Sequence, residues 1–355
     1  MSKRRRFPKI SPLAFQHPLD AKALEAVKKA KGVDYLVRKI NEYGYERYLY
    51  INNIADNVRV GPRQCPQLYN MLVEACEILD VEIPQLYITQ DPMVNAFTFG
   101  SESPFIIINS GMIDLMSDDE LLAIIAHEVG HIKCGHVLYK MVASFLRVAA
   151  EVIADVTLGI GKLIAGPLLV AFYEWDRKSE LTADRAGLLV VQDKNVSINA
   201  LMKLAGGSTK VYEQFNREEF LRQAEDYVEL DHSMLNQFYK LIQVLFRSHP
   251  FPALRAREIN TWADSMEYKN ICNGIYPRVD VDFSWSPSYS STTCPHCNVH
   301  VEPNANFCQA CGAALHSAIA VIEKRSKRRC STCETPLRPS DDFCPNCGMN
   351  TRFDW

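Results

Sequence analysis

The sequence predicts an α+β protein that is mainly helical, contains a small sheet, and ends in a separate small domain. Three short runs rich in β-branched and aromatic residues lie between residues 86 and 109, and longer stretches with helical spacing surround them. Eight of the 12 cysteines form four CxxC pairs near the C-terminus, behind a segment rich in Ser and Pro. With 355 residues, 47% of them apolar, the chain is long enough for one large domain and an appended one.

The N-terminal segment starts with a short basic run at residues 2–7. We expect this run to be a solvated tail, and contact with an anionic surface is the alternative. Pro8 and Lys9 interrupt the apolar residues that follow, so we expect no signal peptide. Helices of mixed charge are predicted at 19–42 and 62–80.

Strands are predicted at 86–89, 95–99 and 105–109. An Asp-Pro pair separates the first two, and a glycine follows the second, as is typical of tight connections. The three runs therefore predict a small sheet ahead of the first long helix.

That helix is predicted to begin at residues 117–120, which form a Ser-x-x-Glu capping box. Within it, His127 and His131 are four residues apart and share one face, so together they can bind one metal ion. Glu128 follows the first histidine and can accept a proton from a metal-activated water. This H-E-x-x-H pattern predicts a hydrolytic zinc site. If the helix is continuous, His136 lies about 140° further round than His131, and we leave His136 out of the site.

Zinc of this kind requires a third protein ligand and one open position. Two glutamates qualify, and each stands four residues before an aspartate: Glu151 before Asp155, and Glu180 before Asp184. The aspartate would hydrogen-bond a ligand histidine and hold its ring. The spacing of Glu151 is similar to that of thermolysin-like peptidases, so the residues alone leave both glutamates open.

Residues 137–173 are less clear in their pattern. Arg147, Glu151 and Asp155 recur every four residues and predict an amphipathic helix. Residues 156–173 carry a single charge, yet their longest charge-free run is far shorter than the roughly 20 residues of a membrane span. We favour a core or lid segment here, with a membrane-touching hairpin as the alternative. Later helices are predicted at 175–193, 197–206, 213–228, 231–247 and 252–272.

The C-terminal unit contains an internal repeat of two CxxC pairs separated by ten residues. Each half supplies four thiolates, the ligand set of one tetrahedral structural zinc. The unit resembles a double zinc ribbon, with the ligand sets Cys294, Cys297, Cys308, Cys311 and Cys330, Cys333, Cys344, Cys347.

Charge argues against nucleic acid as the partner of these ribbons, because residues 294–355 carry only about one net positive charge and the whole chain carries −3. We favour a protein-docking role. The remaining cysteines, Cys65, Cys76, Cys134 and Cys272, are scattered and are interpreted as small apolar packing residues. Thiolate ligands persist in a reducing compartment, which favours the cytoplasm.

An ordered set of motifs resembles the HtpX / CAAX-prenyl-protease family of zinc metallopeptidases over roughly residues 85–260. The set consists of Asn95-Ala96-Phe97, Asn109 to Met112, Leu121 to His131, Ser179 to Asp184, and Ser248-His249-Pro250 with Arg255. The resemblance implies a zincin-type peptidase domain in which Glu180 is the third zinc ligand. Asp184 then supports a ligand histidine.

The same resemblance assigns substrate and catalytic roles. It implies that Asn95 and Ala96 lie on the strand that lines the substrate groove, where an extended peptide can pair with the strand edge. It also implies that His249 steadies the oxyanion of the reaction, and that Arg255 orients it or pairs with Asp184. Membrane-spanning relatives carry long apolar helices ahead of the zinc motif, and none precedes it here. The soluble or surface-bound branch of the family fits better.

These patterns together predict a zinc endopeptidase that acts on protein or peptide substrates, with Glu128 as general base. A non-catalytic zinc scaffold or adaptor, working through its ribbons, is the alternative. We expect three zinc ions, one catalytic and two structural, and a cytoplasmic protein for which peripheral membrane contact stays open. The expected division is an N-terminal helical extension at 1–60, the peptidase domain at 61–283, a linker at 284–293 and the double ribbon at 294–355.

Overall fold

The computed structural model describes residues 4–29, 33, 45–100, 103–156, 160–208, 210–230, 233, 236 and 250–279, with the backbone alone at 45–46 and 147–168. The chain divides into two units, Met1–Asp280 and Val281–Trp355. Every described residue belongs to the first unit. The predicted linker, the eight ribbon cysteines and His249 therefore lie outside the described residues, as does most of the helix predicted at 231–247.

The sheet of the first unit has four strands, β1 (Val58–Val60), β2 (Gln85–Thr89), β3 (Ala96–Phe99) and β4 (Phe105–Asn109), in the order β1-β2-β4-β3. The β2–β4 pair is parallel, and the two outer pairs are antiparallel. All five residues of β4 are buried, as expected of a central strand with a continuous apolar sequence. The predicted small sheet is confirmed, and β1 is an addition too short for the sequence pattern to reveal.

The N-terminal segment is part of the core, so the expectation of a solvated tail is wrong for the described residues. Phe7, Ile10 and Phe15 are fully buried. The backbone N–H of Phe7 donates to the carbonyl of Ile78 at 2.9 Å. Arg4 pairs with two carboxylates of the same unit, those of Glu74 and Asp119. Apolar residues interleaved with the basic run drive this packing.

The helices before the zinc motif are α1 (Pro18–Lys29), α3 (Tyr45–Asp56), α4 (Pro66–Leu79) and α5 (Ser110–Leu115). The sequence pattern did not indicate α3. The predicted helix at 62–80 begins only at Pro66, because Cys65 adopts a left-handed conformation with φ of 56°. Proline at the first helical position then starts α4 without losing a hydrogen bond.

The next helix, α6 (Asp118–Lys133), begins with the predicted capping box. It ends at Lys133, and Gly135 two residues later has a φ of 66°, the left-handed conformation that follows many helices. Helix α7 (His136–Val156) follows, and its first half is bent by 88° from α6. The continuous helix assumed when His136 was left out of the site is therefore wrong.

Helix α8 (Ile160–Val191) is much longer than the helix predicted at 175–193. Phe172 and Trp175 on it are fully buried. Most side chains of 156–173 lie outside the described residues, so the choice between a core segment and a membrane hairpin stays a prediction. Among the described helices, none alone is long and apolar enough to cross a membrane. The bent pair of α6 with His136–Leu146 meets that test by length and composition.

The remaining described helices broadly follow the sequence pattern, and they are α9 (Lys194–Gly206), α10 (Arg217–Glu229), α12 (Pro252–Asp264) and α13 (Met266–Cys272), with a 3-10 turn at Tyr212–Gln214. The helix predicted at 252–272 is two helices, because Ser265 is extended with ψ of 158° and caps α13 by accepting from the N–H of Tyr268. The scattered cysteines are thiols, with Cys76 and Cys134 buried and Cys65 and Cys272 half-buried.

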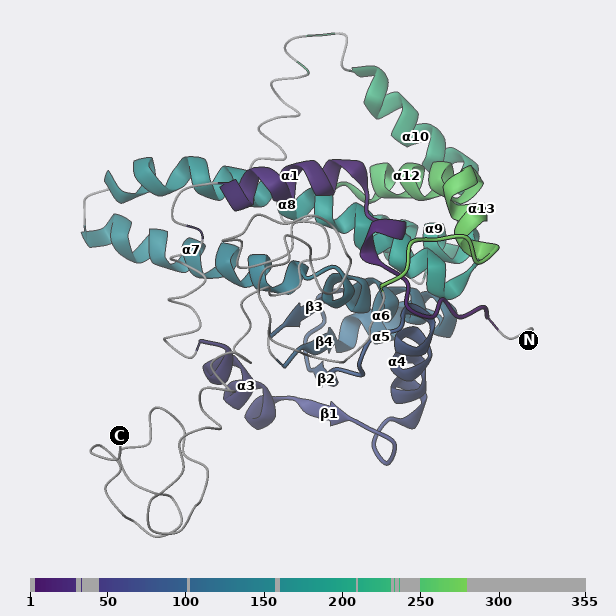
Figure 1. Cartoon of the computed structure of the whole chain (residues 1–355), viewed down its shortest axis with the longest axis horizontal. Coiled ribbons are helices and arrows are strands. Elements are labelled where there is room, and N and C mark those ends of the chain that lie inside the picture. Colours follow the sequence, from purple (N-terminus) through teal and green to yellow (C-terminus); the bar gives the residue numbers. More distant parts are fainter. Residues whose placement is uncertain are drawn as a thin grey trace, which may run out of the picture. The chain divides into compact units, whose positions relative to one another are not determined.

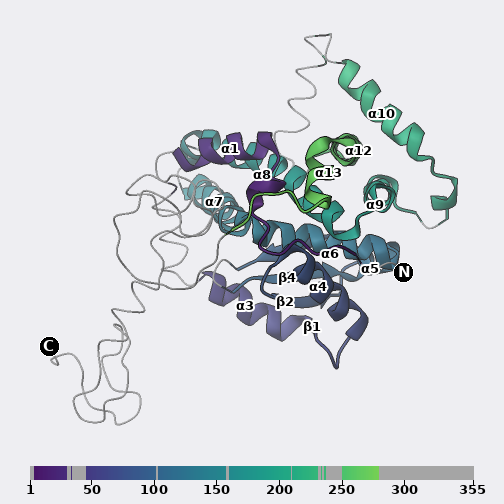
Figure 2. The same cartoon turned by 45° about the vertical axis from the view of Figure 1, so that its right-hand side comes forward.

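Helix α6 lies between the sheet and α8 (Figures 1 and 2), and it packs extensively against α8. Small residues permit a close approach of the two helices. A Cβ atom added to Gly130 of α6 would lie 2.5 Å from the Cβ of Ala186. One added to Gly187 of α8 would lie 3.1 Å from the carbonyl oxygen of Ala123. The pair therefore has no room for a larger side chain at these crossings.

A first prediction concerns this crossing. Gly130→Ala lowers the free energy of unfolding of the first unit by about 1–3 kcal/mol, because the added methyl overpacks a rigid contact. Helix propensity alone favours alanine by about 1 kcal/mol, so any loss reports the clash. Thermal and denaturant unfolding measure the effect.

The double variant Gly130→Ala with Ala186→Gly restores most of this stability, since it removes the opposing methyl. Gly61→Ala is the control, because nothing lies within 4 Å of its added Cβ. A Gly130→Ala protein as stable as the parent contradicts the account.

Candidate metal centre

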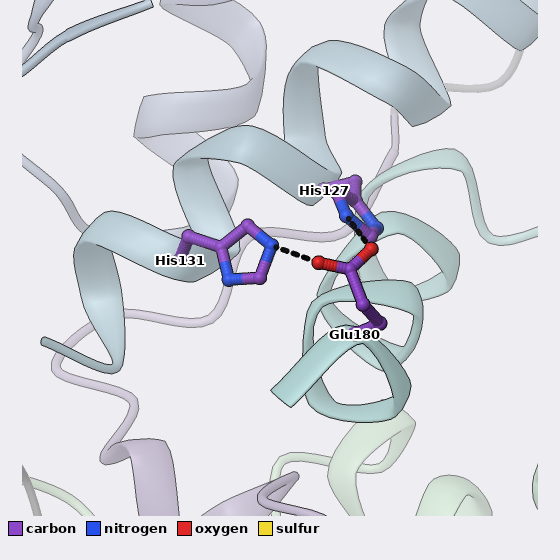
Figure 3. Close-up of side chains that lie close together, drawn as sticks. All are labelled: His127, His131 and Glu180. Atoms are coloured by element: carbon purple, nitrogen blue, oxygen red, sulfur yellow. Dashed lines mark ion pairs between the residues drawn. The ribbon is translucent and has the colours of Figure 1, made fainter. Parts of the chain in front are cut away.

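Three buried side chains from two helices converge on one point. His127 and His131 lie one turn apart on α6, and both turn their Nε2 atoms toward the carboxylate of Glu180 on α8 (Figure 3). The distance from His127 Nε2 to Glu180 Oε2 is 3.2 Å, and that from His131 Nε2 to Glu180 Oε1 is also 3.2 Å. The structure thus brings together the histidine pair and the second of the two candidate glutamates.

This group fits a zinc ion by its donors and its spacing. One ligand atom from each of the three residues lies within 4.8 Å of the others. Two ligands in a tetrahedral zinc site, each about 2.0–2.1 Å from the metal, are about 3.4 Å apart. Two histidines with one glutamate are a catalytic zinc set that leaves one position open. The side chain of the rival Glu151 lies outside the described residues.

The outer nitrogen of His127 has the partner that the sequence suggested. Its Nδ1 lies 3.0 Å from Oδ1 of Asp184, one turn beyond Glu180 on α8. Arg255 of α12 donates to both oxygens of Asp184, from Nε at 2.7 Å and from Nη2 at 2.6 Å. Burial alone raises the pKa of Asp184, but the charge and hydrogen bonds of Arg255 keep it below its ordinary value. Arg255 therefore holds the carboxylate of Asp184 in place, and Asp184 in turn orients the ring of His127.

The outer nitrogen of His131 has a partner that the sequence interpretation excluded. Its Nδ1 lies 3.0 Å from Nδ1 of His136. The bend at Gly135 swings His136 back toward the site, because α7 leaves α6 at a steep angle. The sequence did contain a signal for this bend. Lys133 followed by Gly135 is a pattern typical of a helix end, and it predicts that the helix does not continue to His136.

A half-buried lysine, not foreseen from the sequence, also reaches the site. Lys140 of α7 donates to Glu180 Oε1 at 2.8 Å and pairs with Asp176 Oδ1 at 2.7 Å. Burial alone lowers the pKa of Lys140, but the charges of Asp176 and Glu180 outweigh it and raise the pKa. No sequence pattern links Lys140 to the zinc motif, because the contact depends on how α7 packs on α8.

Glu128 faces the sheet. The hydroxyl of Thr98 on β3 donates to Glu128 Oε2 at 2.6 Å, and both residues are buried. Ala96 begins the same edge strand, and Asn95 directly precedes it. This contact joins the strand predicted to line the substrate groove to the predicted general base.

Two cavities meet at these residues, and Asn95, Ala96, Glu128 and Glu180 line both. The larger, about 560 Å³, extends on the side of His127, and Met112, Ile124, Leu204 and Phe220 are among its apolar lining residues. The smaller, about 230 Å³, extends on the side of His131 and is lined by Phe97, Phe99, Lys140 and Tyr173. A peptide crossing the site would have room on both sides.

The two metal-facing histidines differ in their affinity for a proton. Burial lowers the pKa of His127, but the charges of Glu180 and Asp184 outweigh it and raise that pKa to about 9. Burial and the nearby charge of Lys140 instead hold the pKa of His131 well below its ordinary value. Of the two histidines, His127 therefore holds a proton more strongly than His131.

A buried pair of histidines and a glutamate, with a further carboxylate beside them and a cleft across them, defines the class of metallopeptidases. Residues 62–263 match peptidase family M48, and residues 294–348 match the double zinc ribbon. The chain belongs to peptidase family M48. The predicted family, fold class and metallopeptidase class are thereby confirmed. At this level of description the chain is a zinc protease.

Several curated proteins are similar to this chain. Plastoglobule-localized metallopeptidase 48, chloroplastic, from Arabidopsis thaliana is 38% identical over 259 residues, which is 72% of this chain and 74% of the relative. Protease HtpX homolog 2 from Methanosarcina mazei is 28% identical over 43% of this chain and 59% of its own length. Protease HtpX homolog from Gemmatimonas aurantiaca is 26% identical, over 43% and 62%. The match thus spans less than two thirds of these HtpX homologues. No solved structure matches this chain.

A second prediction concerns the pH dependence of metal binding. Zinc needs the free lone pair of His127, which carries a proton in the metal-free protein below its pKa of about 9. Binding therefore releases about one proton, and the apparent zinc affinity falls about tenfold for each pH unit below 9. Recovery of peptidase activity in zinc buffers at pH 6.5, 7.5 and 8.5 measures the slope. An affinity that is flat over this range contradicts the protonated His127.

Proposed function

We propose that this chain is a zinc-dependent endopeptidase, with His127, His131 and Glu180 as the metal ligands and Glu128 as general base. The observation that carries the proposal is the convergence of both Nε2 atoms on the Glu180 carboxylate at 3.2 Å, beside a cleft that Glu128 also lines. When bound, zinc supplies a Lewis acid that polarises the substrate carbonyl and acidifies a water molecule.

The protein's own groups then perform the proton transfers. Glu128 accepts the proton of the attacking water and delivers it to the departing amine, so it returns to its starting form. The Thr98 hydroxyl holds the carboxylate of Glu128 toward the cleft, which restricts it to one orientation. We assign His249 to stabilising the developing oxyanion, on the resemblance alone. Arg255 acts through Asp184, by keeping the His127 ring in place.

The position of β3 at the edge of the sheet supports an extended peptide as substrate. Such a peptide adds to the strand beside Asn95 and Ala96 through backbone hydrogen bonds, which recognise the main chain independently of sequence. Cavities on both sides of the metal position support cleavage within a chain, because the substrate can continue in both directions.

We further propose that the eight ribbon cysteines bind two structural zinc ions and that the ribbons dock a protein partner. The near-neutral charge of residues 294–355 supports protein over nucleic acid. Their need for reduced thiolates supports a reducing compartment such as the cytoplasm. Sedimentation of membranes from a cell extract separates a freely dissolved enzyme from one held at a membrane surface.

The alternative, a non-catalytic zinc scaffold, predicts a different number of bound zinc ions per chain. An enzyme holds three zinc ions per chain, whereas a protein with a dead peptidase site holds two. The buried Thr98–Glu128 contact supports the enzyme, since a purely structural site has no need of an oriented base. Metal analysis of the full-length protein distinguishes the two.

A third prediction tests the proposed base. Glu128→Gln lowers peptide cleavage by about 10²- to 10⁴-fold, because the amide cannot accept the proton of water. The same variant keeps three zinc ions and the parent's thermal stability, since Glu128 is not a ligand. Cleavage of casein or a quenched peptide, with and without a chelator, provides the measurement.

Glu82→Gln is the matched control, because Glu82 is exposed and far in sequence from the site motif. Its cleavage rate equals that of the parent. Undiminished cleavage by Glu128→Gln would show that another group takes the proton.

A further inference from the structure

A chain of buried polar groups leads away from the candidate metal centre on the side of His131. His131 Nδ1 lies 3.0 Å from His136 Nδ1. On the far side of that second ring, His136 Nε2 lies 3.1 Å from Oδ2 of Asp20, which belongs to α1. This last contact is close, but it does not have the geometry of a ring N–H hydrogen bond. Both His136 and Asp20 are fully buried.

Asp20 is held firmly at the end of this chain. Trp175 Nε1 donates to its Oδ1 at 3.0 Å, and Thr182 Oγ1 donates to its Oδ2 at 2.7 Å. Both donors come from α8, the helix that also carries Glu180. The Thr182 hydroxyl accepts in turn from the backbone N–H of His17 at 3.0 Å. A buried carboxylate with so many donors is an acceptor in a fixed place.

The direction of the protons in this chain follows from the metal, and here the inference rests on the proposed function. A metal on Nε2 of His131 leaves the ring proton on Nδ1. His136 must then accept that proton's hydrogen bond at its own Nδ1 and carry its proton on Nε2. That proton faces the Asp20 carboxylate. The metal thus assigns one tautomer to each ring, and the two rings are ordered between the metal and the Asp20 carboxylate.

We propose that Asp20, acting through His136, positions the ring of His131 for the metal, so that α1 is part of the metal centre. The two ligand histidines are then supported in different ways. His127 meets the carboxylate of Asp184 directly, whereas His131 meets that of Asp20 through an intervening imidazole. Outer groups of this kind orient a ligand ring and raise its basicity.

This support comes from outside the region that matches the peptidase family, which begins at residue 62. The segment before it is thus a contributor to the site and not only an extension packed on its surface. A purely structural role for Asp20, tying α1 to α8, would affect stability alone. The experiment must therefore measure the affinity of the site for a metal ion and the geometry of the bound ion, in addition to stability.

The test uses full-length protein carrying Asp20→Asn, loaded with cobalt(II) in place of zinc. The amide has nearly the shape of the carboxylate but offers an NH₂ donor, which opposes the His136 proton. We expect the His/Glu site to bind cobalt about 10- to 100-fold more weakly, with a changed visible d–d spectrum. The sulfur-to-cobalt bands of the ribbons stay unchanged and serve as the internal reference.

Glu120→Gln is the control, because Glu120 is also a buried carboxylate, paired with Lys203 at the far end of α6. It loses stability but keeps the cobalt affinity and spectrum of the parent. If Asp20→Asn binds cobalt within twofold of the parent and with the same spectrum, the positioning inference is overturned.

A second measurement needs no variant. In ¹⁵N-histidine NMR spectra of the zinc-loaded parent, His136 must show the tautomer protonated on Nε2, and the opposite tautomer overturns the inference. Loss of the proposed function is separate: a parent that binds cobalt at this site yet cleaves no peptide contradicts the endopeptidase alone. A parent that binds no metal at the site contradicts both.

Discussion

The close packing of α6 on α8 is the constraint on which the rest of the metal centre depends. The proposed zinc ligands include two histidines of the H-E-x-x-H motif on one helix, and the third must come from a different helix at bonding distance. Gly130 lies inside the motif itself, between Glu128 and His131, and Gly187 lies two turns beyond Glu180. Both permit the backbones to approach, and a side chain at either would push the helices apart. The glycine in the motif thus serves the ligand on the opposite helix.

Charge balance is the second requirement of this buried site. Glu180 lies between Lys140 and Arg255, and Asp184 is paired with Arg255. Removing one partner from a buried pair costs about 3–5 kcal/mol, because the remaining charge has no compensation. The charges of Glu180 and Asp184 also outweigh burial and raise the pKa of His127 to about 9. A zinc ion bound here would displace the proton that His127 holds below this pKa.

The sequence predicted the features that depend on neighbours along the chain. The capping box of α6, the histidine spacing and the three longer strands are local patterns, and each is visible in a short window. Contacts between distant elements could not be predicted, because no periodicity in the sequence encodes them. They are the packing of the N-terminal segment, Thr98 with Glu128, Lys140 with Glu180, and Asp20 with His136. The placement of His136 failed for a different reason. A single left-handed glycine ended the helix, and geometry calculated for a continuous helix could not apply beyond it.

Anomalous diffraction at the zinc absorption edge, from crystals of zinc-loaded full-length protein, tests the central claim most directly. The account predicts a peak between α6 and α8, about 2.0–2.2 Å from His127 Nε2, His131 Nε2 and a carboxylate oxygen of Glu180. The ribbon zincs give separate peaks among sulfur ligands and do not interfere. A peak whose third protein ligand is Glu151, or no peak between the two helices, would contradict the account.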